Sequence, residues 1–128
     1  MRVLVGDDEP DVALLLDTYL RRRGHQSRMA FSGEQALKLL EAEPFDLVLS
    51  DLRMPGMTGV QLHDRLEAQQ HPAAARMAFV TGNAVEADNQ AFLKRTGCLW
   101  LDKPFDAATF GAFLEQVQAK LQSGAAES

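Results

Sequence analysis

Short apolar runs alternate along this chain with longer segments of mixed polarity. The runs show little alternation between apolar and polar residues, which is typical of strands covered on both faces. We therefore predict short, buried strands rather than half-exposed ones. They fall at residues 3–5, 45–49, 77–80 and 99–101, with a weaker candidate at 25–30.

The segments between these runs have helical periodicity. Apolar residues spaced i, i+3, i+4 and i+7 form one stripe on a helix. The stripes are clearest at Val12, Leu15, Leu16 and Tyr19, and at Phe110, Phe113, Leu114, Val117 and Leu121.

Polar residues and glycines mark where these helices begin and end. Two pairs have the spacing of capping boxes, and two sites look like simpler caps. The boxes are Ser32 with Gln35 and Thr58 with Gln61, the simpler caps are Asn83 with Glu86 and Asp106, and the stops are Gly24 and Gly97.

The alternation of strands and helices predicts an α/β fold of one domain. Strands joined by helices of this length pair in parallel through right-handed crossovers, with helices on both faces of the sheet. We expect five strands and five helices in a domain over residues 1–122. Residues 123–128 are small and polar, and we expect a disordered C-terminal tail there.

Composition and charge restrict the classes of function. The chain has 128 residues, one cysteine and a formal net charge of −5. No block of basic residues is present, so we expect no direct binding to nucleic acid. The first apolar run soon turns acidic and no run reaches membrane-spanning length, so we expect neither a signal peptide nor membrane insertion, and a cytoplasmic location.

Chemically reactive side chains follow four of the predicted strands. In an open parallel sheet, ligands bind at the carboxyl ends of the strands. Each residue also has an ordinary explanation, as a helix cap, a turn former, a strand end or a solvated lysine. Several acids at one edge would repel each other without bound positive charge, which favours a cation site. The residues are Asp7, Asp8, Glu9, Asp51, Thr81 and Lys103.

Four motifs together resemble the response-regulator receiver family. They lie at residues 3–10, 48–59, 80–82 and 101–105, and the resemblance extends from about Arg2 to about Leu121. It implies a flavodoxin-like (βα)5 fold: a doubly wound five-stranded parallel sheet of order 2-1-3-4-5 in three layers, α/β/α. The segment 101–105 is also similar to receivers attached to hybrid histidine kinases.

The resemblance implies a role for each matching residue. Asp51 matches the phosphoacceptor, a carboxylate nucleophile that forms an aspartyl phosphate. Thr81 and Lys103 match the hydroxyl and the ammonium that contact the phosphoryl group. Lys103-Pro104 matches a cis peptide. The implied Mg²⁺ site comprises Asp7, Asp8, Asp51 and the backbone carbonyl of Arg53.

Two positions depart from the family pattern or vary within it. Trp100 stands where the family usually has Tyr or Phe, the aromatic whose rotamer follows Thr81. Trp100 is therefore either a modified switch residue or a tryptophan packed half-exposed on that face. Arg53 and Asn83 match sites that flank the route of the hydrolytic water. We hypothesise that Arg53 affects the lifetime of the phosphorylated state.

The implied function is signalling. A histidine kinase or a histidine phosphotransfer protein would donate the phosphoryl group to Asp51 in a Mg²⁺-dependent reaction. The surface of the fourth helix, fifth strand and fifth helix would then switch toward an unidentified protein partner. Self-phosphorylation and self-dephosphorylation would be the only catalysis. The alternative is a pseudo-receiver that binds proteins without phosphorylation.

Other classes fit the residues less well. A phosphatase of the haloacid dehalogenase type would have a second Asp at position 53, where this chain has Arg. A flavin carrier would have a phosphate cradle rather than an acidic first loop. His25, His63 and His71 lack metal-like spacing, and we expect them at the surface or at strand ends. Cys98 is expected to be a small buried residue.

Overall fold

The computed structural model describes residues 1–127, and these contain one five-stranded parallel sheet and five α-helices. The strand order is β2-β1-β3-β4-β5, which confirms the prediction. The elements are β1 (Arg2–Gly6), α1 (Pro10–Arg22), β2 (Gln26–Ala30), α2 (Gly33–Ala42), β3 (Leu47–Ser50), α3 (Gly59–Ala68), the 3₁₀ helix η1 (Pro72–Arg76), β4 (Met77–Thr81), α4 (Ala87–Thr96), β5 (Trp100–Asp102) and α5 (Ala107–Glu127).

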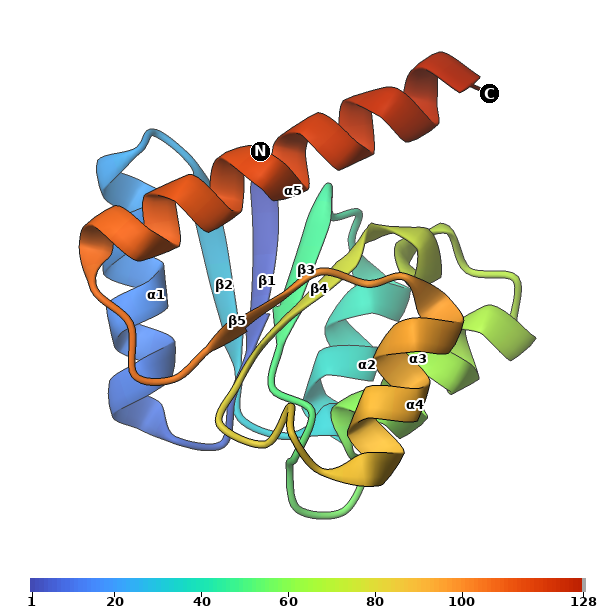
Figure 1. The fold of residues 1–128 in the computed structure, drawn as a ribbon. Helices are drawn as coiled ribbons and strands as arrows, with labels where there is room; N and C mark the ends of the chain where they lie inside the picture. The colour runs from blue at the N-terminus through green and yellow to red at the C-terminus, as the bar shows by residue number, and fades with distance from the viewer. Residues whose placement is uncertain (128) are drawn as a thin grey trace.

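Helices cover both faces of the sheet and produce two separate apolar cores. Successive residues of a strand point to opposite faces. Leu4 of β1 therefore belongs to the core under α2, α3 and α4, while its neighbours Val3 and Val5 belong to the core under α1 and α5. Figure 1 shows these two groups of helices around the strands. This two-sided burial explains why the strands read as unbroken apolar runs.

Most of the predicted helix boundaries are confirmed. Thr58 and Gln61 form a full capping box, and Asp106 caps α5 by accepting from Thr109 N at 2.7 Å. Ser32 caps α2, but the Gln35 side chain accepts from Phe31 N rather than from Ser32 N.

The predicted helix start at Asn83 is wrong. Here α4 begins at Ala87, four residues later. The Asn83 side chain donates to Glu86 Oε1 at 3.2 Å, and Asn89 donates to the Asn83 carbonyl at 2.9 Å. Asn83 thus folds into a turn before α4, because its side chain offers the backbone an alternative to the helix.

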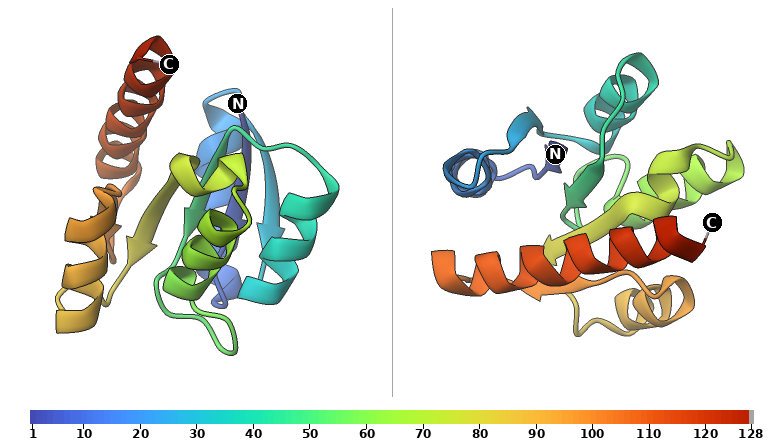
Figure 2. Two further views of the ribbon diagram at one scale, coloured as in Figure 1. Left: turned by 90° about the vertical axis from the view of Figure 1, so that its right-hand side faces the viewer. Right: turned by 90° about the horizontal axis from the view of Figure 1, so that it is seen from above.

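Both chain ends lie at the same end of the molecule, where the strands begin (Figures 1 and 2). The helix α5 continues through Glu127, into the segment for which the sequence predicts a disordered tail, and Ser128 lies outside the described residues. Disorder of that tail stays a prediction. Within residues 1–127, every helix is too short or too polar to cross a membrane.

Candidate functional site

The carboxyl ends of four strands bring the predicted chemical residues together. Asp7 follows β1, Asp51 follows β3, Thr81 ends β4 and Lys103 follows β5. The parallel register aligns these ends, since Gly6 pairs with Ser50 in neighbouring strands. We call this region the carboxyl edge. It gathers residues that are far apart in the sequence.

Lys103 is the electrostatic centre of the carboxyl edge. Its Nζ lies 2.8 Å from Asp7 Oδ2, 2.8 Å from Asp51 Oδ2 and 3.2 Å from Glu9 Oε1. Burial alone would lower the pKa of Lys103, but the hydrogen bond and the charges of Asp51 and Asp7 outweigh burial and raise the pKa. Lys103 therefore remains a cation at any physiological pH.

Asp7 is the most buried carboxylate of the edge, with 1% of its surface exposed. Burial raises the pKa of Asp7, and this effect outweighs the Lys103 ammonium and the Glu9 backbone N–H, which lower it. Among the described residues, the partner of Asp7 Oδ2 is the Lys103 ammonium 2.8 Å away, and no other donor reaches this oxygen. A buried oxygen of this kind favours a further positive ligand.

Four carboxylates gather around this centre. Asp7, Asp8, Glu9 and Asp51 each offer an oxygen, and these oxygens lie within 4.8 Å of one another. One ammonium leaves three formal negative charges uncompensated. Carboxylate oxygens are hard ligands, and Asp8 is exposed, so a bound ion would keep water ligands as Mg²⁺ prefers. The cluster could hold a metal ion, and its chemistry fits Mg²⁺.

Thr81 lies buried at the end of β4. Its Oγ1 accepts a hydrogen bond from Asn83 N at 3.1 Å, which uses an acceptor lone pair and leaves the hydroxyl proton available. The Thr81 carbonyl accepts from Lys103 N at 3.0 Å, so the two residues are linked through the backbone. The peptide bond from Lys103 to Pro104 is cis.

Arg53 contributes its backbone and its side chain to different contacts. Its backbone N donates to Asp51 Oδ1 at 3.1 Å, which orients the carboxylate. Its side chain is largely exposed and reaches Glu86, with 3.5 Å between Nη2 and Oε1. The ion pair therefore connects the loop after Asp51 to the loop before α4.

Trp100 lies outside the charged cluster. It begins β5, pairs with Phe79 of β4 and is 41% exposed. This partial exposure agrees with the expectation of a half-exposed tryptophan. Its possible role in switching stays a prediction.

Two acidic residues of the site have contacts that the sequence did not reveal. The sequence places Glu9 among the reactive residues at the strand ends but assigns it no specific contact, and in the structure its side chain reaches Lys103. Its position directly after Asp7 and Asp8 was the available signal. Glu86 was expected to complete a cap with Asn83, and no sequence pattern indicated its contact with Arg53.

His63 corrects the expectation that the histidines lie at the surface or at strand ends. It is only 3% exposed, and its ring packs edge-on against Phe92 of α4 at 5.1 Å. Its Nδ1 lies 3.1 Å from Asp64 Oδ1. His63 is therefore a packed residue between α3 and α4, away from the charged edge. Cys98 is buried, as predicted.

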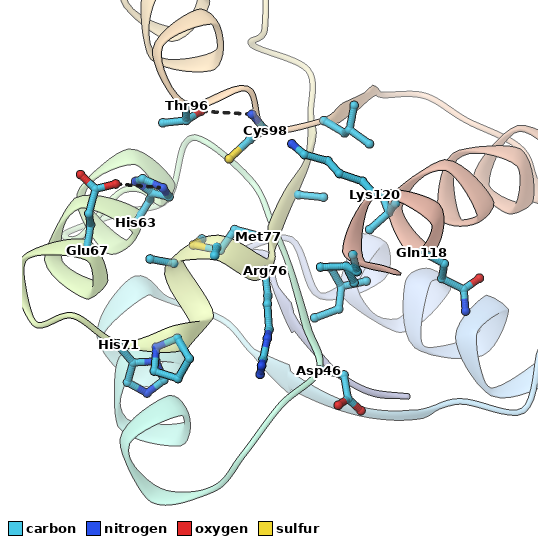
Figure 3. Close-up of a pocket in the computed structure, with 18 of the residues that line it drawn as sticks. Asp46, His63, Glu67, His71, Arg76, Met77, Thr96, Cys98, Gln118 and Lys120 are labelled. Carbon is cyan, nitrogen blue, oxygen red and sulfur yellow. Dashed lines mark hydrogen bonds and ion pairs between the residues drawn. The ribbon is translucent and has the colours of Figure 1, made fainter. Parts of the chain in front are cut away.

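A second and larger hollow lies at the opposite edge of the sheet. It measures about 1420 Å³, against about 340 Å³ for the hollow beside Asp8 and Asp51. Figure 3 shows its lining, with Met77 between side chains that include His63 and Lys120. By volume alone, this hollow would be the candidate functional site. The chemistry selects the smaller one, because the clustered carboxylates and the ammonium lie there.

Known proteins resemble this chain in sequence and in fold. The family model of the response regulator receiver domain matches residues 3–115. The sensor histidine kinase GacS of Pseudomonas protegens is 34% identical over 106 residues, which cover 80% of this chain and 12% of that protein. The transcriptional regulatory protein ZraR of Escherichia coli is 35% identical over 127 residues, covering 98% of this chain and 28% of that protein.

Solved structures show the same fold. A receiver domain protein (CheY-like) from Methanospirillum hungatei superposes with a TM-score of 0.82 at 24% identity, covering 99% of this chain and 98% of the other. A sensor protein from Polaromonas sp. JS666 gives a TM-score of 0.81 at 28% identity, covering 94% and 97%. The flavodoxin-like prediction is confirmed.

Proposed function

We propose, from the premise that this chain belongs to the response regulator receiver domain family, that it accepts a phosphoryl group on Asp51 in a Mg²⁺-dependent reaction. The family comprises signalling domains of two-component systems, not classical enzymes. One observation carries the proposal. Lys103 Nζ lies 2.8 Å from both Asp51 and Asp7, inside a cluster of carboxylates.

The reaction is a phosphoryl transfer to a carboxylate. An oxygen of Asp51 bonds to phosphorus while the bond from phosphorus to the donor's imidazole nitrogen breaks, and the electron pair stays on that nitrogen. Such transfers need positioning and neutralisation of charge on the phosphoryl oxygens. Lys103 supplies a fixed positive charge at Asp51, and the Arg53 backbone N–H orients the attacking carboxylate.

Asp7, Asp8, Asp51 and the carbonyl of Arg53 would hold the metal ion. When bound, Mg²⁺ supplies positive charge that neutralises the transferring oxygens. The buried Asp7 oxygen, which is paired only with Lys103, and the uncompensated negative charge support this assignment.

The switching surface would be α4, β5 and α5. A phosphoryl group adds up to about two negative charges and three strong acceptors. The free hydroxyl proton of Thr81 can donate to one of these oxygens, and Lys103 can turn toward another. Because β5 pairs with β4 at Thr81 and Asp102, displacement at the site would reach β5 and Trp100 directly.

The phosphodonor would be a histidine kinase or a histidine phosphotransfer protein, and the downstream partner a protein that recognises the switched surface. The chain spans 12% to 35% of the length of curated relatives such as GacS and the activator PfeR of Pseudomonas aeruginosa. The activities of those longer proteins therefore do not extend to this chain.

Incubation with Mg²⁺ and acetyl phosphate, followed by intact mass measurement, tests the proposal. We expect a gain of one phosphoryl group in the wild type and none in Asp51→Asn or without Mg²⁺. Trp100 is the only tryptophan, so its emission should change on phosphorylation of the wild type alone. A folded protein that binds Mg²⁺ and gains no mass would contradict the proposal and favour the pseudo-receiver alternative.

A further inference from the structure

A side chain in the first turn of α2 forms a hydrogen bond with the loop between Asp51 and α3, residues 52–58. Glu34, the second residue of α2, accepts a hydrogen bond from Met57 N through Oε1 at 3.0 Å. These two residues are 23 positions apart in the sequence. The loop that follows Asp51 is therefore anchored to a different element of the fold.

Two glycines permit this close approach. Gly56 has a φ of +71°, and a Cβ there would lie 2.5 Å from Glu34 Oε1. A Cβ on Gly33 would collide with the Met57 carbonyl. The loop backbone at Met57 thus lies directly against Gly33 of α2, so a side chain at Gly33 would push the two apart, while a side chain at Gly56 would displace the Glu34 carboxylate.

The same loop contacts the reactive carboxylate at its other end. Arg53 N donates to Asp51 Oδ1 at 3.1 Å. At the far end of the loop Gly59 N donates to the Leu52 carbonyl at 3.0 Å, which closes the loop on itself. A displacement of the loop at Met57 would therefore move the Arg53 amide relative to Asp51.

We propose that Glu34 is a positioning residue for Asp51, acting through the 52–58 loop. It lies outside the charged cluster and touches neither Lys103 nor the carboxylates. Its hydrogen bond to Met57 holds the loop, and the loop orients the Asp51 carboxylate and carries the Arg53 carbonyl. The second part, an effect on Mg²⁺ affinity, rests on the proposed function.

Three variants separate this role from helix stability and from charge. Glu34→Ala removes the acceptor. Glu34→Gln removes the charge but keeps a carbonyl oxygen that can accept from Met57 N. Ser32→Ala removes the N-cap of α2, whose Oγ accepts from Gln35 N, and leaves Glu34 in place.

The first readout is hydrogen exchange at single amides of the metal-free protein, which does not depend on the proposed function. In Glu34→Ala we expect exchange at both Met57 N and Arg53 N to accelerate about tenfold. Glu34→Gln and Ser32→Ala should leave both amides near the wild-type rates. Faster exchange at Met57 with an unchanged Arg53 amide would overturn the proposal, because the loop would not transmit the change.

The second readout is the Mg²⁺ dissociation constant from calorimetry. Groups that hold a metal ligand in place typically change affinity by 10-fold to 100-fold when removed. We expect about tenfold weaker binding in Glu34→Ala and wild-type binding in the other two variants. Equal weakening in Glu34→Gln would assign the effect to charge, and equal weakening in Ser32→Ala to helix stability; either result overturns the proposal. Absence of Mg²⁺ binding in the wild type would instead contradict the proposed function.

Discussion

The two edges of the sheet, one where the strands begin and one where they end, differ in how their charged side chains are paired. At the amino edge, where the strands begin, positive and negative charges balance in ion pairs near the surface, as between Arg2 and Glu43 at 2.6 Å and between Arg95 and Asp64 at 3.0 Å. At the carboxyl edge, three carboxylates contact one ammonium, and a fourth, that of Asp8, lies beside them. The larger hollow lies at the first edge and the excess charge at the second.

The charged groups of the amino edge therefore contribute to the folded structure alone, while those of the carboxyl edge can take part in the proposed reaction. Single exposed ion pairs contribute little to stability, and their charges are satisfied without a ligand. Buried carboxylates in excess cost stability unless a cation is supplied. Substitutions at the carboxyl edge should therefore change phosphorylation, while substitutions at the amino edge should change stability alone.

The largest expected effect is that of Lys103→Ala. The variant leaves Asp7 and Asp51 without their ammonium, which should lower the free energy of unfolding by about 3 kcal/mol. The rate of phosphorylation should fall by about 100-fold or more, because a fixed charge at the transferring group is lost. Urea denaturation and acetyl phosphate kinetics measure the two effects.

Lys38→Ala is the matched control for this substitution. Lys38 is an exposed lysine on α2, and its removal should change neither quantity. A Lys103→Ala protein with wild-type phosphorylation kinetics would remove the electrostatic argument for the carboxyl edge.

Met77→Ala tests the amino edge. Met77 is 6% exposed, belongs to the core under α2, α3 and α4, and lines the large hollow. Its truncation should lower the free energy of unfolding by about 2–3 kcal/mol. Phosphorylation of the folded variant should proceed at the wild-type rate. Loss of phosphorylation with intact folding would show that the two edges are not separable.

Asp7→Asn should raise the free energy of unfolding at pH 7, whereas most substitutions lower it. The folded state raises the pKa of Asp7 above 3.8, so it binds the proton more tightly than the unfolded state does. Between pH 3.8 and the raised pKa of folded Asp7, ionisation of Asp7 therefore lowers the free energy of unfolding as the pH rises. The variant removes this fall and should be more stable than the wild type at pH 7.

The same variant should lose Mg²⁺ binding. Denaturation at several pH values, with calorimetry for Mg²⁺, checks both expectations. The stability advantage should shrink as pH falls toward 3.8. A variant that is less stable at pH 7 would mean that the Lys103 ion pair outweighs the cost of burying Asp7.

Arg53→Ala should have the smallest effect on stability. Its ion pair with Glu86 is exposed and 3.5 Å long, so the free energy of unfolding should change by less than about 0.5 kcal/mol. The lifetime of the aspartyl phosphate should nevertheless change, because this side chain lies beside the pocket of Asp51. Decay of the phosphorylated mass over time measures the lifetime, with the exposed Arg65→Ala as control. An unchanged lifetime would contradict the hypothesis.

The sequence predicted the sheet well because apolar runs are a strong signal for strands buried on both faces. β2 gave the weakest signal, since it is an edge strand in which exposed residues such as Gln26 and Arg28 interrupt the pattern. The false helix start at Asn83 had a local cause. An Asn three residues before a Glu fits a cap and also fits the side-chain hydrogen bond that forms in the turn.

The site was predictable only in part. Motifs at strand ends placed Asp7, Asp51 and Lys103 at one edge, since parallel strands bring their carboxyl ends together. Contacts between segments that are distant in the sequence gave no comparable sequence signal. Glu34 meets Met57 because Gly33 lets the Met57 backbone approach α2 and Gly56 leaves room for the Glu34 carboxylate, and neither spacing nor charge indicates this.

The most direct test of the central claim locates the phosphoryl group. Protein phosphorylated with acetyl phosphate and Mg²⁺ is reduced with borohydride, which converts an aspartyl phosphate into homoserine, and peptides are then sequenced by mass spectrometry. The account predicts homoserine at position 51 alone. Modification of another residue instead, or none in protein that has gained the phosphoryl mass, would contradict it.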